Sequence, residues 1–245
     1  MEQNGYLITD SLINALEYGV PQSRERAIAI GFRSDLVPAK SSHELSSQFS
    51  WDRNKLFSID KIMSYPWSKT DPFGENLSLD CPVGIPVNLT VEYWFKKNNV
   101  NHHPNSHHSF TPRAGLIRFL SVLEGDDSKK SYKRLHRWRY SPTACYGNNE
   151  VHLHPYQARR ISVAEALAIQ SLPPEFELPS KMSLTDMFKS TGNGVPFLAA
   201  KGLATTINEF LVGNCSLKRS AAIDPNYHLQ TLHLEKQLSL LDLTR

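Results

Sequence analysis

Gly-Val-Pro-Gln-Ser-Arg-Glu-Arg at residues 19–26, followed at once by Ala-Ile-Ala-Ile-Gly-Phe at residues 27–32, is the stretch that decides the fold. A turn with two arginines leads into an almost continuously apolar run, which is typical of a strand covered on both faces. Arg24 and Arg26 offer planar guanidinium groups that stay charged at any working pH. Such groups recognise phosphates and the edges of nucleobases. The stretch therefore predicts a binding site at the rim of a sheet.

The surrounding chain changes character along its length. Residues 5–33 are predicted to form a strand, a turn and a strand, because Tyr6 and Ile8 alternate with polar neighbours. From residue 35 to about 156, repeated prolines and polar clusters predict loops and short strands. The pattern at residues 87–95 fits one strand or one short helix, and its period does not decide between them.

Two helices are predicted in the last third of the chain. Ser162 followed by Glu165 has the spacing of a capping box, so a helix is expected over residues 163–171. Pro196 is well placed as the first residue of a second helix, which keeps a helical apolar period. Beyond residue 227, a leucine-rich tail predicts an amphipathic helix that either docks on the chain itself or binds a partner.

The bulk composition is that of an ordinary globular protein. Of the 245 residues, 40% are hydrophobic and 21% are charged, and the net charge of +3 permits a nucleic-acid partner without requiring one. No apolar run reaches the length of a membrane span, and the polar first five residues do not read as a signal peptide. Cys81, Cys145 and Cys215 are few and widely spaced, which favours a reducing cytoplasm over a disulfide framework.

Residues 128–149 combine six basic side chains with four aromatic ones and contain no acidic residue. The basic ones are Lys129, Lys130, Lys133, Arg134, Arg137 and Arg139, and the aromatic ones are Tyr132, Trp138, Tyr140 and Tyr146. This combination suits contact with a sugar-phosphate backbone. A solvated basic face with a few packed rings is the alternative.

Four histidines lie close together in a loop rich in proline, asparagine and serine, and they are His102, His103, His107 and His108. Clustered histidines without cysteine or carboxylate partners usually belong to a solvated loop. We therefore predict no metal site here.

The stretch at residues 19–26 resembles motif VIII of the cytosine-C5 DNA methyltransferases, whose core is Gln-x-Arg-x-Arg. Residues 159–173 resemble motif IX. Residues 192–196, Gly-Asn-Gly-Val-Pro, resemble motif X, with Gly194 where the family usually has alanine. The three motifs follow the family's order, and a long variable segment takes the place of its target-recognition domain. The resemblance implies an α/β fold: the C-terminal portion of an S-adenosylmethionine-dependent methyltransferase sheet plus a mixed, loop-rich target-recognition domain.

The resemblance also implies four parts. Residues 1–36 would be late strands of the catalytic domain, and residues 37–156 the target-recognition domain. Residues 157–214 would carry the motif IX and X helices back to the catalytic domain. Residues 215–245 would form the amphipathic tail.

The family motifs imply roles for individual residues. Arg26 should donate to O2 of the target cytosine and Arg24 should help to hold the base pocket, with Gln22 aiming both; salt bridges at a strand edge are the alternative for the arginines. Asn193 and Val195 should line the S-adenosylmethionine pocket, in a Gly-Asn-Gly turn whose backbone N–H groups are free for a polar or anionic group. The alternative for Asn193 is a helix cap that only closes the fold.

Contacts with double-stranded DNA are expected from the basic segment and from a Ser-Pro-Thr stretch before motif IX. The residues predicted for these contacts are Lys133, Arg134, Arg137, Arg139 and Thr143. Arg160 resembles the motif IX arginine, which implies that it organises the recognition domain and does not react.

Three family motifs, I, IV and VI, do not occur in these residues: the glycine-rich Phe-x-Gly-x-Gly, the nucleophile Pro-Cys-Gln and the acid Glu-Asn-Val. Cys81-Pro82 has the reverse order and follows motif VIII, so we interpret it as a packed or loop thiol. Methylation at C5 needs a thiolate that attacks C6 of a flipped base. The residues present therefore make up only part of the family's active site.

We accordingly predict a C-terminal part or subunit of a DNA (cytosine-5)-methyltransferase, inactive alone, that needs an N-terminal partner for its cysteine nucleophile. The alternatives are a non-catalytic DNA-binding module, an inactive truncated relic, or a fragment of one longer polypeptide. The expected location is a prokaryotic cytoplasm, at the nucleoid. Missing neighbours of the strand at residues 27–32 should leave apolar surface and an open edge, which predicts self-association without the partner. The DNA sequence that is recognised does not follow from one chain.

Overall fold

The computed structural model of the protein describes residues 4–75, 77–112, 116–129, 131–144, 146 and 150–213. The chain divides into two compact units, residues 1–208 and 209–245. The predicted tail helix, Cys145 and Cys215 lie outside the described residues.

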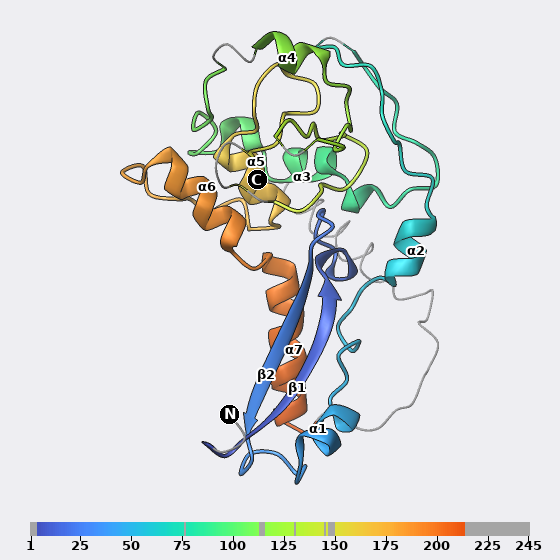
Figure 1. Cartoon of the computed structure of the whole chain (residues 1–245), viewed down its shortest axis with the longest axis vertical. Coiled ribbons are helices and arrows are strands. Elements are labelled where there is room, and N and C mark those ends of the chain that lie inside the picture. The colour runs from blue at the N-terminus through green and yellow to red at the C-terminus, as the bar shows by residue number, and fades with distance from the viewer. Residues whose placement is uncertain are drawn as a thin grey trace, which may run out of the picture. The chain divides into compact units, whose positions relative to one another are not determined.

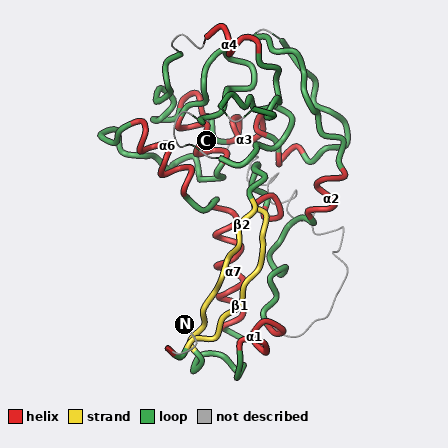
Figure 2. The backbone as a smooth tube through the Cα atoms, viewed as in Figure 1, coloured by secondary structure: helices red, strands yellow, loops and turns green. Residues whose placement is uncertain are grey.

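A long antiparallel hairpin forms the sheet of the described residues (Figures 1 and 2). Its strands, β1 (Tyr6–Asn14) and β2 (Glu25–Arg33), pair in register from Tyr6 opposite Arg33 to Asn14 opposite Glu25. This confirms the predicted strand, turn and strand. Ile13 is buried on one face of the hairpin, whereas Leu12 on the other face is 59% exposed.

The prediction that both faces of the strand after the arginines are covered is wrong for the described residues. Within residues 27–32, Phe32 is buried while Ala27, Ala29 and Gly31 are exposed. The physical reason is that β2 pairs with β1 alone among the described residues, and helices pack on one face of the hairpin. An apolar sequence therefore lies at an uncovered sheet face.

The last helix of the unit, α7 (Phe197–Leu211), covers the buried face of the hairpin (Figure 1). Ala199 and Leu203 pack in a cluster with Ile13 and Tyr18. The carbonyl of Pro196 accepts the Ala200 N–H at 3.0 Å, so the proline precedes the helix by one residue instead of starting it.

Gly202 lets α7 approach the hairpin connection closely. A Cβ atom at this position would lie 2.5 Å from Cδ1 of Tyr18, a side chain that is itself buried. Gly202→Ala would gain about 1 kcal/mol of helix propensity. We expect the overlap to outweigh this gain, giving a net destabilisation of about 1–3 kcal/mol in urea unfolding. A variant more stable than the wild type would contradict the packing of Gly202 on Tyr18.

Residues 49–57, called the strap below, join the hairpin to α7. The strap follows α1 (Ser42–Gln48), which packs against β1. Nε1 of Trp51 donates to Thr9 Oγ1 at 3.0 Å, and Nδ2 of Asn54 donates to Thr206 Oγ1 at 3.0 Å. The chain therefore stays with the hairpin well beyond residue 37, where the sequence places the start of the recognition domain.

The largest core lies among short helices in the rest of the unit: α3 (Val91–Lys97), α5 (Val163–Ile169) and α6 (Leu184–Asn193). Two further helices are α2 (Ile59–Ser64) and α4 (Leu116–Ser121), and single 3-10 turns span Ala15–Tyr18, Val87–Leu89 and Val100–His102. Residues 87–95 are thus helical and not a strand, but in two pieces, a 3-10 turn and the start of α3, instead of one short helix. Among the described residues of 37–156, isolated bridges replace the predicted short strands.

The predicted capping box is confirmed. The Ser162 hydroxyl accepts the Glu165 N–H at 3.2 Å, and the Glu165 carboxylate accepts the Ser162 N–H at 2.7 Å. The helix ends at Ile169, two residues before the predicted end, because Ser171 adopts a left-handed conformation with φ 56°.

None of the helices in the part of the chain that the structure describes has the length and apolar character needed to cross a membrane.

Candidate functional site

The ten-residue connection of the hairpin is closed by one side chain. Asn14 Oδ1 accepts the N–H of Leu16 at 3.1 Å and the N–H of Arg24 at 3.2 Å. The Ala15 N–H donates to the Arg24 carbonyl at 2.9 Å, and Gly19 turns the chain with φ 83°. These contacts fix where the Gln-x-Arg-x-Arg stretch begins.

Arg24 joins three segments that are far apart in the sequence. Its guanidinium is buried and donates to the Ala144 carbonyl at 3.1 Å and to the Gly192 carbonyl at 3.0 Å. Ala144 follows the Ser-Pro-Thr stretch, and Gly192 begins the Gly-Asn-Gly-Val-Pro stretch. Arg24 therefore brings the Gln-x-Arg-x-Arg stretch, the Ser-Pro-Thr stretch and the Gly-Asn-Gly-Val-Pro stretch to one place.

The Ser-Pro-Thr stretch lies directly on the arginine turn. Gln22 and Ser141 form a parallel bridge, in which the Ser23 N–H donates to the Ser141 carbonyl at 2.9 Å. Thr143 Oγ1 donates to the Ser23 carbonyl at 2.7 Å. Gln22 is fully buried, and its Oε1 lies 3.4 Å from the Ala144 N atom. These residues hold the turn in place. The Thr143 hydroxyl donates its hydrogen bond to the turn within the chain.

Arg26 lies at the start of β2 and is exposed, with Nη1 donating to the carbonyl of Glu25 at 2.6 Å. Asn193, the last residue of α6, is exposed, and Val195 is 59% exposed. The positions predicted to touch base and cofactor are thus accessible, unlike the buried Arg24.

One expectation about the Gly-Asn-Gly stretch is wrong. It is not an open turn, because α6 continues through Asn193 and ends at the cap Gly194. The first N–H groups of α7 are also used within the chain. Phe197 N–H donates to the Gln170 carbonyl at 2.9 Å and Leu198 N–H to the Ser171 hydroxyl at 3.0 Å. These two donors are therefore not free for an anionic ligand.

Arg134, predicted to contact DNA, is fully buried. Its guanidinium donates to the carbonyls of Phe119, Val122, His154 and Gln157, so it fastens two loops together. Burial lowers the pKa of Arg134 to about 10, although the charges of Glu124 and Glu75 oppose this change. A guanidinium with this many internal acceptors favours a structural role over a contact with DNA.

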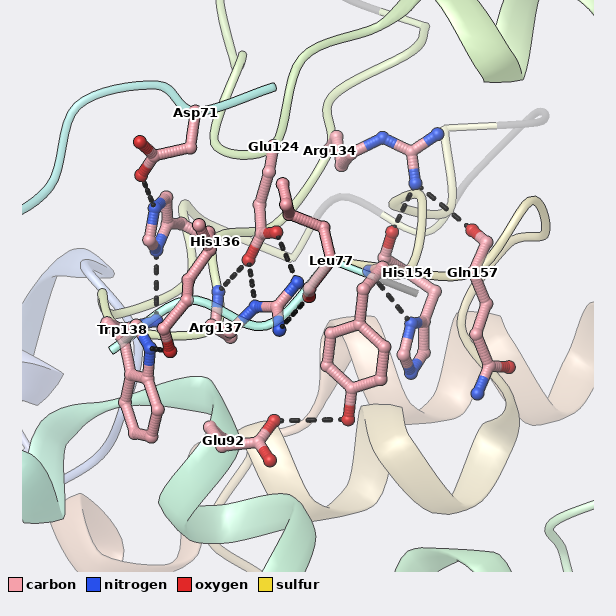
Figure 3. Close-up of polar contacts among 12 residues, drawn as sticks. Asp71, Leu77, Glu92, Glu124, Arg134, His136, Arg137, Trp138, His154 and Gln157 are labelled. Atoms are coloured by element: carbon pink, nitrogen blue, oxygen red, sulfur yellow. Dashed lines mark hydrogen bonds and ion pairs between the residues drawn. The ribbon is translucent and has the colours of Figure 1, made fainter. Parts of the chain in front are cut away.

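Arg137 is also buried, in a two-pronged ion pair with Glu124 (Figure 3). Nε and Nη2 of Arg137 donate to the two carboxylate oxygens at 2.9 and 2.8 Å, and Nη1 donates to the Leu77 carbonyl at 3.0 Å. The guanidinium lies 4.4 Å from the ring centre of Tyr156, whose hydroxyl donates to Glu92 at 3.1 Å. This residue likewise belongs to the interior of the region.

The neighbours of Arg137 contact residues 68–71 and Leu79, which lie on either side of Leu77 in the sequence. His136 Nε2 lies 2.8 Å from Asp71 Oδ2, and Nε1 of Trp138 donates to the Leu79 carbonyl at 2.7 Å. Arg139 donates to the carbonyls of Lys69 and Gly125 at 3.1 and 3.0 Å, while Lys133 is half-buried. The side chains of residues 136–139 therefore make hydrogen bonds and ion pairs mainly within the chain.

Arg160 is buried beside aromatic rings. Its Nη1 donates to the Val151 carbonyl, and its guanidinium lies 5.6 Å from the ring of Phe119 and 5.8 Å from that of Tyr132. Burial lowers the pKa of Arg160.

Of the loop histidines, His103 is buried and takes part in hydrogen bonding. Its Nδ1 accepts the Asn105 N–H at 3.0 Å, and its Nε2 lies 3.1 Å from the Phe176 carbonyl oxygen. The rings of His107 and His108 are 4.1 Å apart. In the ranges that the structure describes, no group of three or more histidine, cysteine, aspartate or glutamate side chains could hold a metal ion.

Three buried titratable groups, His152, His154 and Glu165, predict acid sensitivity. Burial, with the charges of Lys133 and Arg160, lowers the pKa of His152 to about 3, so the folded state keeps the ring neutral. The unfolded chain binds a proton below the ordinary histidine pKa of about 6.5. Stability should therefore fall by about 2 kcal/mol between pH 7 and pH 5.

Urea unfolding at the two pH values measures this loss, and His152→Phe should remove the part that is due to His152, while burial of His154, which also lowers its pKa, leaves a remainder. A variant with the same pH dependence as the wild type would contradict the assignment. Glu165 acts in a separate, lower window. Burial opposes its ionisation, but hydrogen bonds from Arg159 and His154 lower the Glu165 pKa, so its contribution is lost only as the pH falls below about 4.5.

The chain is similar to known proteins over most of its length. The family model described as C-5 cytosine-specific DNA methylase matches residues 1–209. The type II methyltransferase M.NmeDI of Neisseria meningitidis serogroup C is 57% identical over 207 residues, which cover 84% of this chain and 47% of that protein. M.FnuDI, a type II methyltransferase of Fusobacterium nucleatum, is 27% identical over 89% of this chain and 60% of that protein. The chain thus spans only about half the length of these relatives.

A solved structure supports the fold. A protein of E. coli, described as a DNA modification methyltransferase encoded within a prophage, matches with a TM-score of 0.50 at 22% identity, over 84% of this chain and 62% of that chain. The small sheet with helices around it is accordingly a mixed α/β arrangement of the methyltransferase type. With the family match over residues 1–209, this chain belongs to the C-5 cytosine-specific DNA methylase family.

Proposed function

We propose that this chain is the C-terminal part of a DNA (cytosine-5)-methyltransferase. It would supply DNA recognition, the base-pocket arginine and part of the S-adenosylmethionine pocket. The observation that carries the proposal is the position of Arg24, which ties the arginine turn to Ala144 and Gly192 through its two hydrogen bonds. A DNA substrate would place the protein at the nucleoid of a prokaryotic cytoplasm.

Arg26 would contact the substrate base. Its exposed guanidinium lies at the start of β2, two residues beyond the anchored Arg24. A cytosine turned out of the duplex presents its O2 as an acceptor, and a fixed guanidinium can donate to it while the ring gains electron density. In this proposal Arg24 positions the turn and Arg26 touches the base.

The exposed residues of the motif X stretch fit part of a cofactor pocket. Asn193 offers an amide that both donates and accepts, and the accessible Val195 offers an apolar surface. A nucleoside with a polar amino-acid end needs both kinds of contact. S-adenosylmethionine, when bound, supplies the methyl group.

The attacking thiolate would come from outside these 245 residues, which contain no Pro-Cys dipeptide. Cys81 is poorly suited, because burial raises the pKa of its thiol and a thiolate is the reactive form. The exposed apolar face of the hairpin, with Leu12, Ala27 and Ala29, would pack against the part that brings the nucleophile. That part is either a partner chain or a continuation of the same polypeptide.

Tritium transfer from labelled S-adenosylmethionine to duplex DNA tests the proposal. The chain would be assayed alone and after co-expression with the part of M.NmeDI that lies outside its match to this chain. We expect transfer only from the combination. Robust transfer by the chain alone would refute the need for a partner. DNA binding without transfer by a stably assembled combination would favour the non-catalytic module.

A further inference from the structure

Glu17 lies in the hairpin connection and is almost completely buried, although it is charged. One carboxylate oxygen, Oε2, accepts the Asn14 N–H at 3.0 Å. The other, Oε1, lies 3.0 Å from Nζ of Lys55, and the two side chains are 10% and 16% exposed. Its backbone carbonyl accepts the N–H groups of Leu56 and Phe57 at 2.7 and 3.1 Å. The residue thus links the connection to the strap.

Asn14 carries this link to the arginine turn. Its N–H is held by Glu17, while its Oδ1 accepts the N–H groups of Leu16 and Arg24. Arg24 in turn donates to Ala144 and Gly192, so its backbone position decides whether both carbonyls can be reached. Hydrogen bonds of this length tolerate displacements of only a few tenths of an ångström before they weaken.

Lys55 is well placed to fix the position of the Glu17 carboxylate. The strap that carries it is fastened to the hairpin through Trp51 and to α7 through Asn54. A second carboxylate, Asp52 Oδ1, lies 2.8 Å from Nζ of Lys55, but its side chain is 83% exposed. The buried partner, Glu17, is therefore the one whose position depends on the lysine.

We propose that Lys55 and Glu17 are positioning residues for the base pocket. Their ion pair acts through Asn14 to set the place of Arg24, and thereby of Arg26 two residues later. The proposal rests on the function proposed above for these arginines. It predicts that the ion pair matters more for the geometry of the turn than for the rest of the fold.

Amide hydrogen exchange on the full chain tests the link without any enzyme assay. Lys55→Met should raise the exchange rates of the Leu16 and Arg24 amides at least tenfold relative to those of α5. Lys55→Arg should restore them to within about threefold of the wild type, because it keeps the charge and reach. Asp52→Asn is the matched control, and it should leave these amides unchanged.

If Lys55→Met fails to fold because Glu17 is left buried without its counterion, the double variant Lys55→Met/Glu17→Gln removes both charges. It should fold and still show faster exchange at Leu16 and Arg24. A uniform rise that includes the α5 amides would mean that the pair only stabilises the fold, and the proposal would be wrong.

The assembled enzyme provides the second readout. Single-turnover methyl transfer with Lys55→Met should fall about tenfold while the Kd for DNA stays within twofold, because misplaced groups lose rate more than binding. Faster exchange with an unchanged transfer rate would refute the role in positioning. If the wild-type assembly transfers no methyl group, the proposed function fails, whereas exchange in the chain still decides whether the ion pair orders the turn.

Discussion

Arg26→Ala should lower methyl transfer by the assembled enzyme about 100-fold or more, without unfolding the chain. A preorganised donor to an oxygen that gains charge in the transition state contributes about 10²–10³ to the rate. The side chain is exposed and donates to the carbonyl of its exposed neighbour Glu25, so its loss leaves no buried group unsatisfied. Single-turnover kinetics at saturating DNA and S-adenosylmethionine measure the effect.

Arg33→Ala is the matched control for Arg26. Arg33 lies at the other end of β2, is exposed and pairs with Asp35 through Nε at 2.9 Å. Its removal should leave the transfer rate within about threefold of the wild type, since exposed ion pairs contribute little. If Arg26→Ala were as active as Arg33→Ala, the proposed contact with cytosine would be wrong.

Arg134→Met should be the most destabilising single substitution among the predicted DNA-binding residues. The change leaves the carbonyls of Val122 and His154 without their Arg134 donor and weakens the hydrogen bonding of the Phe119 carbonyl, which keeps the Val122 N–H at 3.5 Å. Each such loss costs about 1–3 kcal/mol, and a total of about 3–5 kcal/mol should lower the thermal midpoint by about 10 °C or more. Thermal unfolding followed by circular dichroism measures the midpoint.

Two further variants separate shape from charge at this position. Arg134→Lys keeps the charge but replaces a planar fork with a single ammonium, so we expect it to lose most of the same stability. Lys129→Met removes an exposed charge from the same segment and should shift the midpoint by less than about 2 °C. If Arg134→Met shifted the thermal midpoint as little as Lys129→Met does and also weakened DNA binding, Arg134 would face DNA and the structural role would be wrong.

Local signals in the sequence were sufficient for several elements. The hairpin follows from alternation and from the Gly19 turn, and the capping box of Ser162 and Glu165 fixes the start of α5. These features depend on residues that are close together in the sequence, so they can be predicted from the sequence alone. Arg24 also links the Gln-x-Arg-x-Arg, Ser-Pro-Thr and Gly-Asn-Gly-Val-Pro stretches, all three of which stand out in the sequence.

Other features depend on distant partners, which a single sequence does not display. A run of basic and aromatic residues reads as a DNA-binding face, yet Arg134 and Arg137 turn inward because carbonyls and Glu124 lie there to receive them. The use of Ser171 to cap α7 and the path of the strap depend likewise on long-range packing. Glu17, two residues before the motif VIII-like stretch, is marked in the sequence only as a charged residue among apolar ones.

We propose that this chain builds the base pocket while another segment brings the attacking sulfur. Trapping with 5-fluorocytosine DNA tests it most directly, because the covalent adduct marks the cysteine that attacks C6. Mass spectrometry of the assembled enzyme should find the adduct on a cysteine outside these 245 residues, and the isolated chain should form none. An adduct on Cys81, Cys145 or Cys215 of the isolated chain would contradict the claim.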